Sequence, residues 1–160
     1  IPLRLVGSEM CIRDSTNYEG VAFLQKTFPE RTVISFELNK SDVEPRDNAL
    51  HLDCCFQPIG KDQAVIYPGG FKNEDDVQFL VDYFGEENII EITRGEMYNM
   101  NSNLFSISPE VIVSEKGFTR LNEELRRRGF TVEEIPYAEI AKMEGLLRCS
   151  TLPLRRKYND

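Results

Sequence analysis

The segments FGEENIIEI (residues 84–92) and RGFTVEEIP (residues 128–136) follow one plan. In each, the glycine follows a stretch of the chain whose apolar residues have helical spacing. A run that contains β-branched residues then follows the glycine. A glycine directly behind such a pattern is typical of a helix end, and the run behind it is typical of a strand. The sequence therefore predicts the same helix-to-strand connection twice.

The surrounding sequence extends this likeness into a repeat of four elements. Two short strands precede each helix, so the order strand, strand, helix, strand occurs twice, with an offset of about 45 residues. The strands are expected at residues 31–38, 49–58, 64–67, 88–92, 103–107, 111–114 and 130–136, and the helices at residues 18–28, 73–84 and 118–128. Such a repeat predicts pseudo-symmetric units around an axis. An irregular α+β domain with a chance likeness fits the pattern equally well.

Length and composition are those of one soluble globular domain. The chain has 160 residues, of which 41% are hydrophobic and 29% are charged, and both fractions are ordinary for such a domain. No apolar run approaches the length of a membrane span. The net charge of -8 lacks the basic footprint of a nucleic-acid-binding protein. We therefore expect neither a membrane nor a nucleic acid among its partners.

The cysteine pattern predicts a reducing compartment. Cys54 and Cys55 are adjacent, which disfavours a disulfide between them, and the chain has no Cys-x-x-Cys pair for a structural zinc site. A metal site of His51, Asp53 and Cys55 is also disfavoured, because alternate positions on one strand offer few converging ligands. We expect a cytoplasmic protein with reduced cysteines and without a metal.

The first fifteen residues resemble a non-native leader. The segment MCIRD (residues 10–14) matches a translated sequencing adapter, and the charges of Glu9 and Arg13 argue against a signal peptide. We therefore expect residues 1–15 to be foreign, and residues 16–160 to be the C-terminal part of a single catalytic domain. A native N-terminal segment is the alternative.

His51 is the only histidine of the chain, and Asp53 lies two residues after it. On a strand, residues two apart share a face and lie about 7 Å apart. The sequence therefore predicts that both side chains point to one face, while Leu52, Cys54 and Phe56 enter the core. Such a pair offers a base and a carboxylate to a site. A hydrogen-bonded structural pair is the plainer interpretation.

Cys149 is a candidate nucleophile near the C-terminal end. A thiol becomes a good nucleophile when a neighbour lowers its pKa or takes its proton, and His51 is a base suited to that task. Gly145 permits a tight bend before the thiol, and Arg148 could lower the thiol pKa or bind an anionic group. A buried cysteine near a strand is the plainer interpretation.

Three asparagines alternate in the segment NMNSN (residues 99–103). In a strand or an extended loop their three amides would share one face and could orient a polar ligand. Asparagines of this kind often only satisfy the backbone of a turn, so both interpretations are open.

Three motifs together resemble the guanidine-modifying superfamily of the pentein fold. They are NALHLDCCF (residues 48–56), NMNSN (residues 99–103) and LRCSTLPL (residues 147–154). Their order and spacing are similar to those of the dimethylarginine dimethylaminohydrolase and arginine deiminase-related branch, which also includes amidinotransferases. The likeness spans residues 16–153.

This resemblance implies a fold, a set of roles and a reaction. The implied fold is a partial five-bladed α/β propeller built from strand-strand-helix-strand units. Cys149 would be the nucleophile and His51 the general acid and base. Asp53 would bind the guanidinium nitrogens, while Asn103 and Asn101 would hold the substrate or shape the loop around it.

The implied reaction is hydrolysis of arginine or a methylated arginine to citrulline, through a covalent thiouronium and without a metal or organic cofactor. The implied partner is a small guanidino substrate, and a homo-oligomer is compatible with the sequence. An amidinotransferase, in which an amine replaces water as acceptor, is an alternative. A non-catalytic pentein used for binding or assembly is another.

The chain departs from the family pattern in two places. The family's Glu-Gly-Gly-Asp segment is absent, and Glu144 and Gly145 stand where relatives often have two glycines. If only the second half of the propeller is present, we expect a chain that is almost inactive alone, with apolar edges that favour association.

Overall fold

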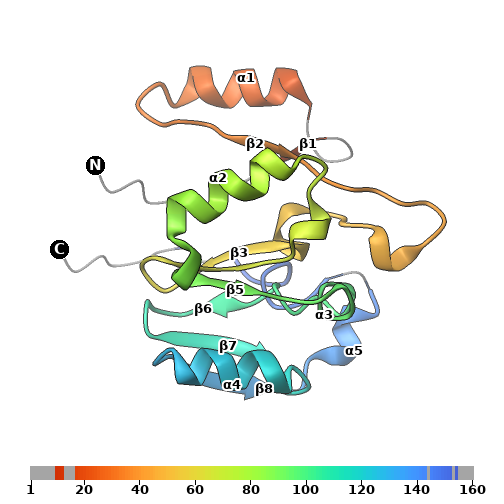
Figure 1. The fold of residues 1–160 in the computed structure, drawn as a ribbon, viewed down its shortest axis with the longest axis vertical. Helices are drawn as coiled ribbons and strands as arrows, with labels where there is room; N and C mark the ends of the chain where they lie inside the picture. The colour runs from red at the N-terminus through yellow and green to blue at the C-terminus, as the bar shows by residue number, and fades with distance from the viewer. Residues whose placement is uncertain (1–9, 13–16, 144, 153, 155–160) are drawn as a thin grey trace.

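The structure is a computed structural model that describes residues 10–12, 17–143, 145–152 and 154 (Figure 1). Two units of mixed strands and helices are stacked along its long axis. The first unit contains β3 (Phe56–Ile59), β4 (Gln63–Ile66), α2 (Glu74–Phe84) and β5 (Ile89–Glu91). The second unit contains β6 (Phe105–Ser106), β7 (Val111–Glu115), α4 (Thr119–Arg127) and β8 (Thr131–Ile135).

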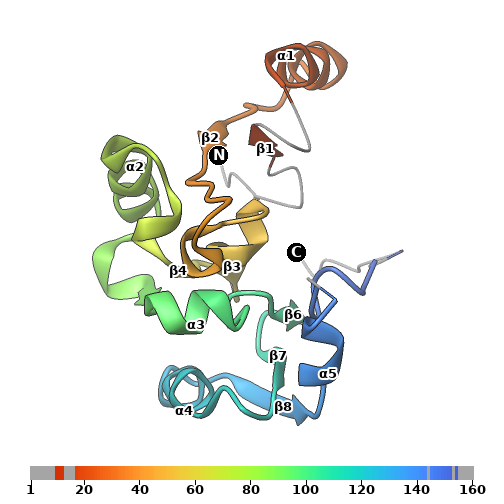
Figure 2. The ribbon, with the colours of Figure 1, turned by 90° about the vertical axis from the view of Figure 1, so that its right-hand side faces the viewer.

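The two sheets have the same topology. In the first unit β3 pairs with β4 in antiparallel orientation, and β4 pairs with β5 in parallel. In the second unit β6 and β7 are antiparallel, and β7 and β8 are parallel. A parallel pair needs a crossover, which α2 and α4 supply on the same side of the stack (Figure 2). The α/β repeat predicted from the sequence is therefore present.

The other elements are short. Helix α1 (Tyr18–Thr27) lies at one end of the molecule, away from both units (Figures 1 and 2), and none of its residues is buried. Helix α3 (Arg94–Tyr98) connects the two units, and α5 (Ala138–Ala141) precedes the C-terminal segment. Strand β1 (Met10–Ile12) pairs in parallel with β2 (Ser35–Glu37). Single 3-10 turns occupy Pro45–Asp47, Leu52–Cys54, Pro68–Gly70 and Glu86–Asn88.

Part of the predicted leader is described and part is not. Strand β1 falls inside it, whereas residues 1–9 and 13–15 lie outside the described residues. In the described part of the chain, no helix combines the length and the apolar character that crossing a membrane requires.

The helix ends follow from local chemistry. Asn17 caps α1, because its side-chain oxygen accepts a hydrogen bond from the Gly20 N–H at 2.9 Å. Asn73 precedes α2 but does not cap its backbone. Gly85 ends α2 at φ 84°, and Gly129 follows α4 at φ 92°. Residues with a side chain rarely adopt such values, so the two glycines that marked the repeat in the sequence are needed where they stand.

One hydrophobic core runs through both units. Its largest fully buried side chains include Phe56, Ile66 and Leu80 of the first unit, and Ile112 and Leu125 of the second. Burying a side chain of this size contributes about 1.5–3 kcal/mol. The shared core therefore holds the two sheets together.

The strand predicted at residues 49–58 is shorter than expected. It begins only at Phe56, because the preceding backbone closes on itself as a 3-10 turn. The Cys54 N–H donates to the His51 carbonyl at 3.1 Å, and the Cys55 N–H donates to the Leu52 carbonyl at 3.0 Å. These local bonds occupy groups that a strand would use for its ladder.

Two arginines at opposite ends of α4 join the two units. Arg128 donates to the main-chain carbonyls of Glu87 at 2.8 Å and Ile89 at 3.0 Å. Arg120 donates to the carboxylate of Glu96 at 2.6 Å. Because a guanidinium presents its donors in a rigid plane, these contacts fix the position of α4 against the first unit.

Replacing Arg128 with alanine is expected to lower the free energy of unfolding by about 1.5–3 kcal/mol, because two carbonyls lose a charged donor. Urea denaturation of the chain measures this change. Arg127→Ala is the matched control. Its side chain is 75% exposed, against 22% for Arg128, and such a surface pair contributes about 0–1 kcal/mol. Equal losses in the two variants would contradict the joining role of Arg128.

Candidate active site

Three segments that are far apart in the sequence meet beside Cys149. Asp53 belongs to the 3-10 turn before β3, Asn103 to the turn between α3 and β6, and Cys149 to the C-terminal segment. The Cys149 sulfur lies 3.2 Å from Nδ2 of Asn103 and 3.5 Å from Oδ2 of Asp53. The structure thus brings together three of the residues that the sequence singled out.

Asn103 holds the Cys149 loop with both ends of its amide. Its Oδ1 accepts hydrogen bonds from the main-chain N–H groups of Arg148 at 2.9 Å and Cys149 at 3.3 Å. Its Nδ2 donates to the Cys149 sulfur. The side chain is fully buried, so water does not compete for these bonds. Asn103 therefore positions the thiol loop, and its contact with a substrate stays a prediction.

The loop that carries Cys149 is anchored by its own residues. Leu146 and Leu147 are buried, and the Ser150 N–H donates to the Leu146 carbonyl at 3.0 Å. A Cβ placed on Gly145 would lie 3.2 Å from the Cβ of Cys149, which is closer than ordinary van der Waals contact. At the predicted bend, the backbone of Gly145 thus lies close to the side chain of Cys149. The bend leaves Cys149 exposed, so the interpretation as a buried cysteine is wrong.

The surroundings of Cys149 raise the pKa of its thiol. Burial of the sulfur is the main cause, because desolvation disfavours the thiolate, and the negative charge of Asp53 acts in the same direction. Hydrogen bonds from the Leu146 backbone and from Asn103 oppose the shift. The Cys149 thiol is therefore protonated at neutral pH. The expected lowering of its pKa by Arg148 is not observed.

His51 and Asp53 do not share a strand, and this part of the sequence prediction is wrong. His51 is extended and precedes the 3-10 turn, so the two side chains are not related by strand geometry. The imidazole is exposed, and it forms no hydrogen bond to the residues that the structure describes. Its role as acid and base stays a prediction. The burial predicted for Leu52, Cys54 and Phe56 is confirmed.

The asparagine segment is a tight turn, so of the two interpretations left open by the sequence, the turn is the one observed. Met100 adopts a left-handed conformation with φ 64°, and the Asn103 N–H donates to the Met100 carbonyl at 2.9 Å. The amides consequently do not share one face, since Asn99 is exposed while Asn101 and Asn103 are buried. The Asn101 Oδ1 has no hydrogen-bond partner in the described part of the chain. Its contact with a substrate stays a prediction.

Two features near the site escaped the sequence reasoning. Ser102 is fully buried, and its Oγ donates to the main-chain carbonyl of Asp53 at 3.0 Å. Helix α3 was also missed. Thr93 and Glu96 form a reciprocal capping box at its start, and their spacing of three residues is a recognisable signal for a helix start.

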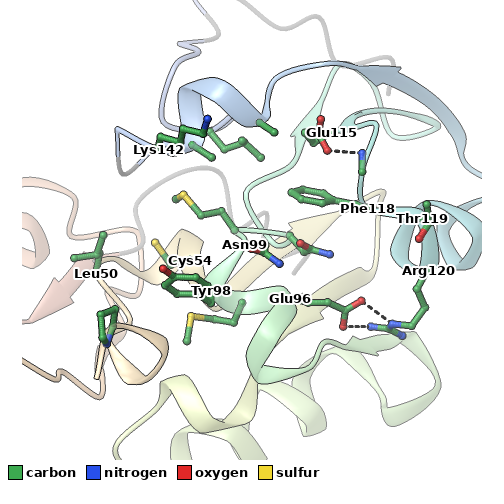
Figure 3. A pocket seen from close by; sticks show the side chains of 18 of the residues that line it. Leu50, Cys54, Glu96, Tyr98, Asn99, Glu115, Phe118, Thr119, Arg120 and Lys142 are labelled. Carbon is green, nitrogen blue, oxygen red and sulfur yellow. Dashed lines mark hydrogen bonds and ion pairs between the residues drawn. The ribbon is translucent and has the colours of Figure 1, made fainter. Parts of the chain in front are cut away.

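A cavity of about 770 Å³ lies between α3 and the second unit (Figure 3). Its charged groups are already engaged. Glu96 and Arg120 face each other in an ion pair of 2.6 Å, and Glu115 accepts a hydrogen bond from the Gly117 N–H. Cys54 lines this cavity, but Cys149 and its polar neighbours do not. The Cys149 thiol is therefore exposed outside this cavity.

The described residues contain no group of three or more His, Cys, Asp and Glu side chains that could hold a metal ion. The chemistry that the Cys149 site offers is nucleophilic. It combines an exposed thiol, a carboxylate in contact with that thiol, and a buried amide that fixes the thiol loop.

Comparison with known proteins gives a family match over most of the chain. Residues 9–156 match the family described as N,N dimethylarginine dimethylhydrolase, eukaryotic. The uncharacterized protein YkgA of Bacillus subtilis is 30% identical over 145 residues, covering 91% of this chain and 47% of the relative. The arginine deiminase of Oenococcus oeni is 25% identical over 158 residues, covering 79% of this chain and 37% of the relative.

A solved structure has the same fold. The N-terminal domain of ArgZ, a cyanobacterial arginine dihydrolase bound to its substrate, superimposes with a TM-score of 0.75 at 22% identity. The match covers 89% of this chain and 49% of that domain. The chain therefore spans less than half of the length of the proteins it matches in these comparisons.

Replacing Asp53 with asparagine is expected to lower the pKa of the Cys149 thiol, because a negative charge beside the sulfur disfavours the thiolate. The pH dependence of Cys149 alkylation by iodoacetamide, followed on the Cys149 peptide by mass spectrometry, measures this pKa. Alkylation at neutral pH should be faster in the variant. Asp82→Asn removes the same charge from an exposed position on α2 and should leave the profile unchanged. An unchanged profile in Asp53→Asn would contradict the assigned contact.

Proposed function

Because the chain belongs to the N,N-dimethylarginine dimethylhydrolase family of the guanidine-modifying pentein superfamily, we propose that it carries the thiol side of a site that hydrolyses arginine or a methylated arginine. The observation that carries this proposal is the contact of the exposed Cys149 thiol with the Asp53 carboxylate, 3.5 Å apart. A carboxylate in that position can hold a guanidinium group beside a nucleophilic sulfur.

Binding comes first in the proposed reaction. A guanidinium carbon is a poor electrophile because its charge is delocalised, so its orientation against the sulfur supplies a large part of the rate gain. Asp53 accepts hydrogen bonds from the guanidinium nitrogens and fixes the plane of the group. The positive charge of the bound cation also offsets the negative charge of Asp53 near Cys149, and it replaces water around the sulfur with a favourable partner for the thiolate. Both effects lower the thiol pKa that the free chain holds above its ordinary value.

The covalent step follows from that arrangement. His51 takes the proton of the Cys149 thiol, the resulting thiolate forms a carbon–sulfur bond to the guanidino carbon, and the carbon becomes tetrahedral. His51 gives a proton to one nitrogen, the carbon–nitrogen bond breaks, and ammonia or a methylated amine leaves. A covalent thiouronium remains on Cys149.

Water then completes the reaction. His51 takes a proton from a water molecule, the water oxygen attacks the thiouronium carbon, and the carbon–sulfur bond breaks. The products are citrulline and the regenerated thiol. In sum, arginine and water give citrulline and ammonia, and neither a metal nor an organic cofactor takes part.

In this proposal, a chain of family length supplies the parts of the site that enclose the substrate. The two strand-strand-helix-strand units are two blades of a five-bladed propeller, and the rest of the ring closes over Cys149. Two large side chains of α1, Tyr18 and Phe23, are 76% and 66% exposed, which is compatible with packing against missing elements or another copy. A reduced, exposed thiol fits the cytoplasm.

The test is turnover of arginine and of dimethylarginine, with citrulline as the measured product. A chain extended to family length with the upstream sequence of its own source genome should form citrulline, whereas the 160-residue chain should form little. Cys149→Ser in the extended chain is expected to reduce turnover on the order of 10⁴-fold or more, because it removes the nucleophile. Cys55→Ala, which removes a buried thiol outside the site, should keep the turnover.

The product decides between the alternatives. Citrulline formed in water supports the hydrolase. A new guanidino compound, formed only when an amine is supplied, would replace the hydrolase by an amidinotransferase. An extended chain that forms neither product, or one that keeps its turnover in Cys149→Ser, would refute the proposed function.

A further inference from the structure

Met100 adopts a backbone conformation that its residue type avoids. Its φ of 64° lies in the left-handed region, which residues with a side chain rarely adopt. The Met100 side chain is buried in the core. Strain of this kind persists only where surrounding contacts compensate it, and it is concentrated at functional sites.

Ser102 and Asn103, two and three residues after Met100, bond to two different segments of the candidate site. Ser102 donates from Oγ to the main-chain carbonyl of Asp53 at 3.0 Å. Its neighbour Asn103 binds the main chain and the sulfur of Cys149. Both side chains are fully buried. One short piece of backbone is thus bonded to the segment that carries the carboxylate and to the segment that carries the thiol.

We propose that Ser102 is a positioning residue that sets the placement of the Asp53 carboxylate against the Cys149 thiol. This inference rests on the proposed function in one respect, namely that these two groups act on the same substrate. The hydroxyl of Ser102 does not touch the substrate. It acts through the backbone of Asp53.

The other bonds of the Asp53 turn have a different effect. The Cys54 N–H binds the His51 carbonyl, and the Cys55 N–H binds the Leu52 carbonyl. These bonds connect residues of the same turn, so they set its shape without tying it to the thiol loop. The Ser102 bond reaches Asp53 across 49 positions of sequence. Adjacent Cα atoms are about 3.8 Å apart. Ser102 and Asn103 therefore hold the Asp53 segment and the Cys149 segment to neighbouring positions of one backbone.

The consequence for the site is geometric. A reactive constellation works when its groups are held within about 0.5 Å of the productive arrangement. Loss of the Ser102 hydroxyl frees the Asp53 segment but leaves every group that enters the reaction. A change in the alkylation of the Cys149 thiol then reports a change in the position of Asp53 relative to the sulfur.

The test is Ser102→Ala in the 160-residue chain, read through the pH dependence of Cys149 alkylation by iodoacetamide. Among the described ionisable residues, Asp53 is in contact with this thiol, Arg148 is next to it in sequence, and His51 lies two residues before Asp53. When Asp53 is no longer held against the sulfur, its charge opposes the thiolate less. Alkylation near neutral pH is expected to become at least about threefold faster.

Ser114→Ala is the matched control. Ser114 is also a fully buried serine, on β7, and its hydroxyl finds no partner among the residues that the structure describes. Its replacement should leave the alkylation profile unchanged. Ser102→Cys keeps a weaker donor at similar volume and should give a profile between those of the parent and Ser102→Ala. It carries the test if the alanine variant does not fold by circular dichroism.

Two outcomes would overturn the inference. One is a parental profile in a folded Ser102→Ala chain, and the other is an equal shift in Ser114→Ala. Alkylation needs no turnover, so this test is separate from that of the proposed function. If the profile shifts in the 160-residue chain while the extended chain forms no citrulline, the positioning role is supported and only the guanidine chemistry is refuted.

Discussion

The buried amide of Asn103 is the contact on which the candidate site depends. It joins the loop of Cys149 to a turn 46 residues earlier in the chain, and it does so by accepting two backbone N–H bonds and donating one to the sulfur. The bonds within the Cys149 loop fold that loop but do not place it. Because Asn103 is excluded from water, breaking its bonds would leave buried polar groups unpaired, which is costly. The position of the exposed thiol is therefore set from the core.

Much of the fold was predictable because its signals are local. The glycines after α2 and α4 and the alternation of short strands with helices gave the repeat, which the sheet topology confirms. The turn at residues 52–54 was not predictable in the same way. Leu52 and Cys54 are buried there, and they would be buried in a strand as well. An alternating pattern over so few residues fits both backbones, and only the ladder contacts of the folded chain separate them.

The candidate site likewise contains residues that the sequence identified and residues that it did not. Cys149, Asp53 and Asn103 were singled out because each belongs to a motif with a family resemblance, and they do meet. Ser102 had no such signal, because a serine within a turn is ordinary. The conformation of Met100 was also hidden, since methionine rarely takes a positive φ. That conformation makes the segment a turn, and it separates Asn99 from the two buried asparagines. Conformations and contacts that depend on tertiary structure cannot be recognised from the local sequence pattern.

The pairing of Cys149 with a carboxylate looks unfavourable for a nucleophile, since Asp53 opposes formation of the thiolate. The exposure of the thiol explains how this pairing could be useful. An exposed cysteine with a low pKa reacts with oxidants and unspecific electrophiles, because the thiolate is the reactive form. Under the proposed function, the charge of Asp53 adds to desolvation in keeping the thiol protonated, and this protects the thiol while the site is empty. Under the proposed function, a guanidinium that binds Asp53 removes that protection and supplies a charge that favours the thiolate. The same carboxylate then selects the substrate and restricts the nucleophile to it, because a neutral molecule provides neither effect.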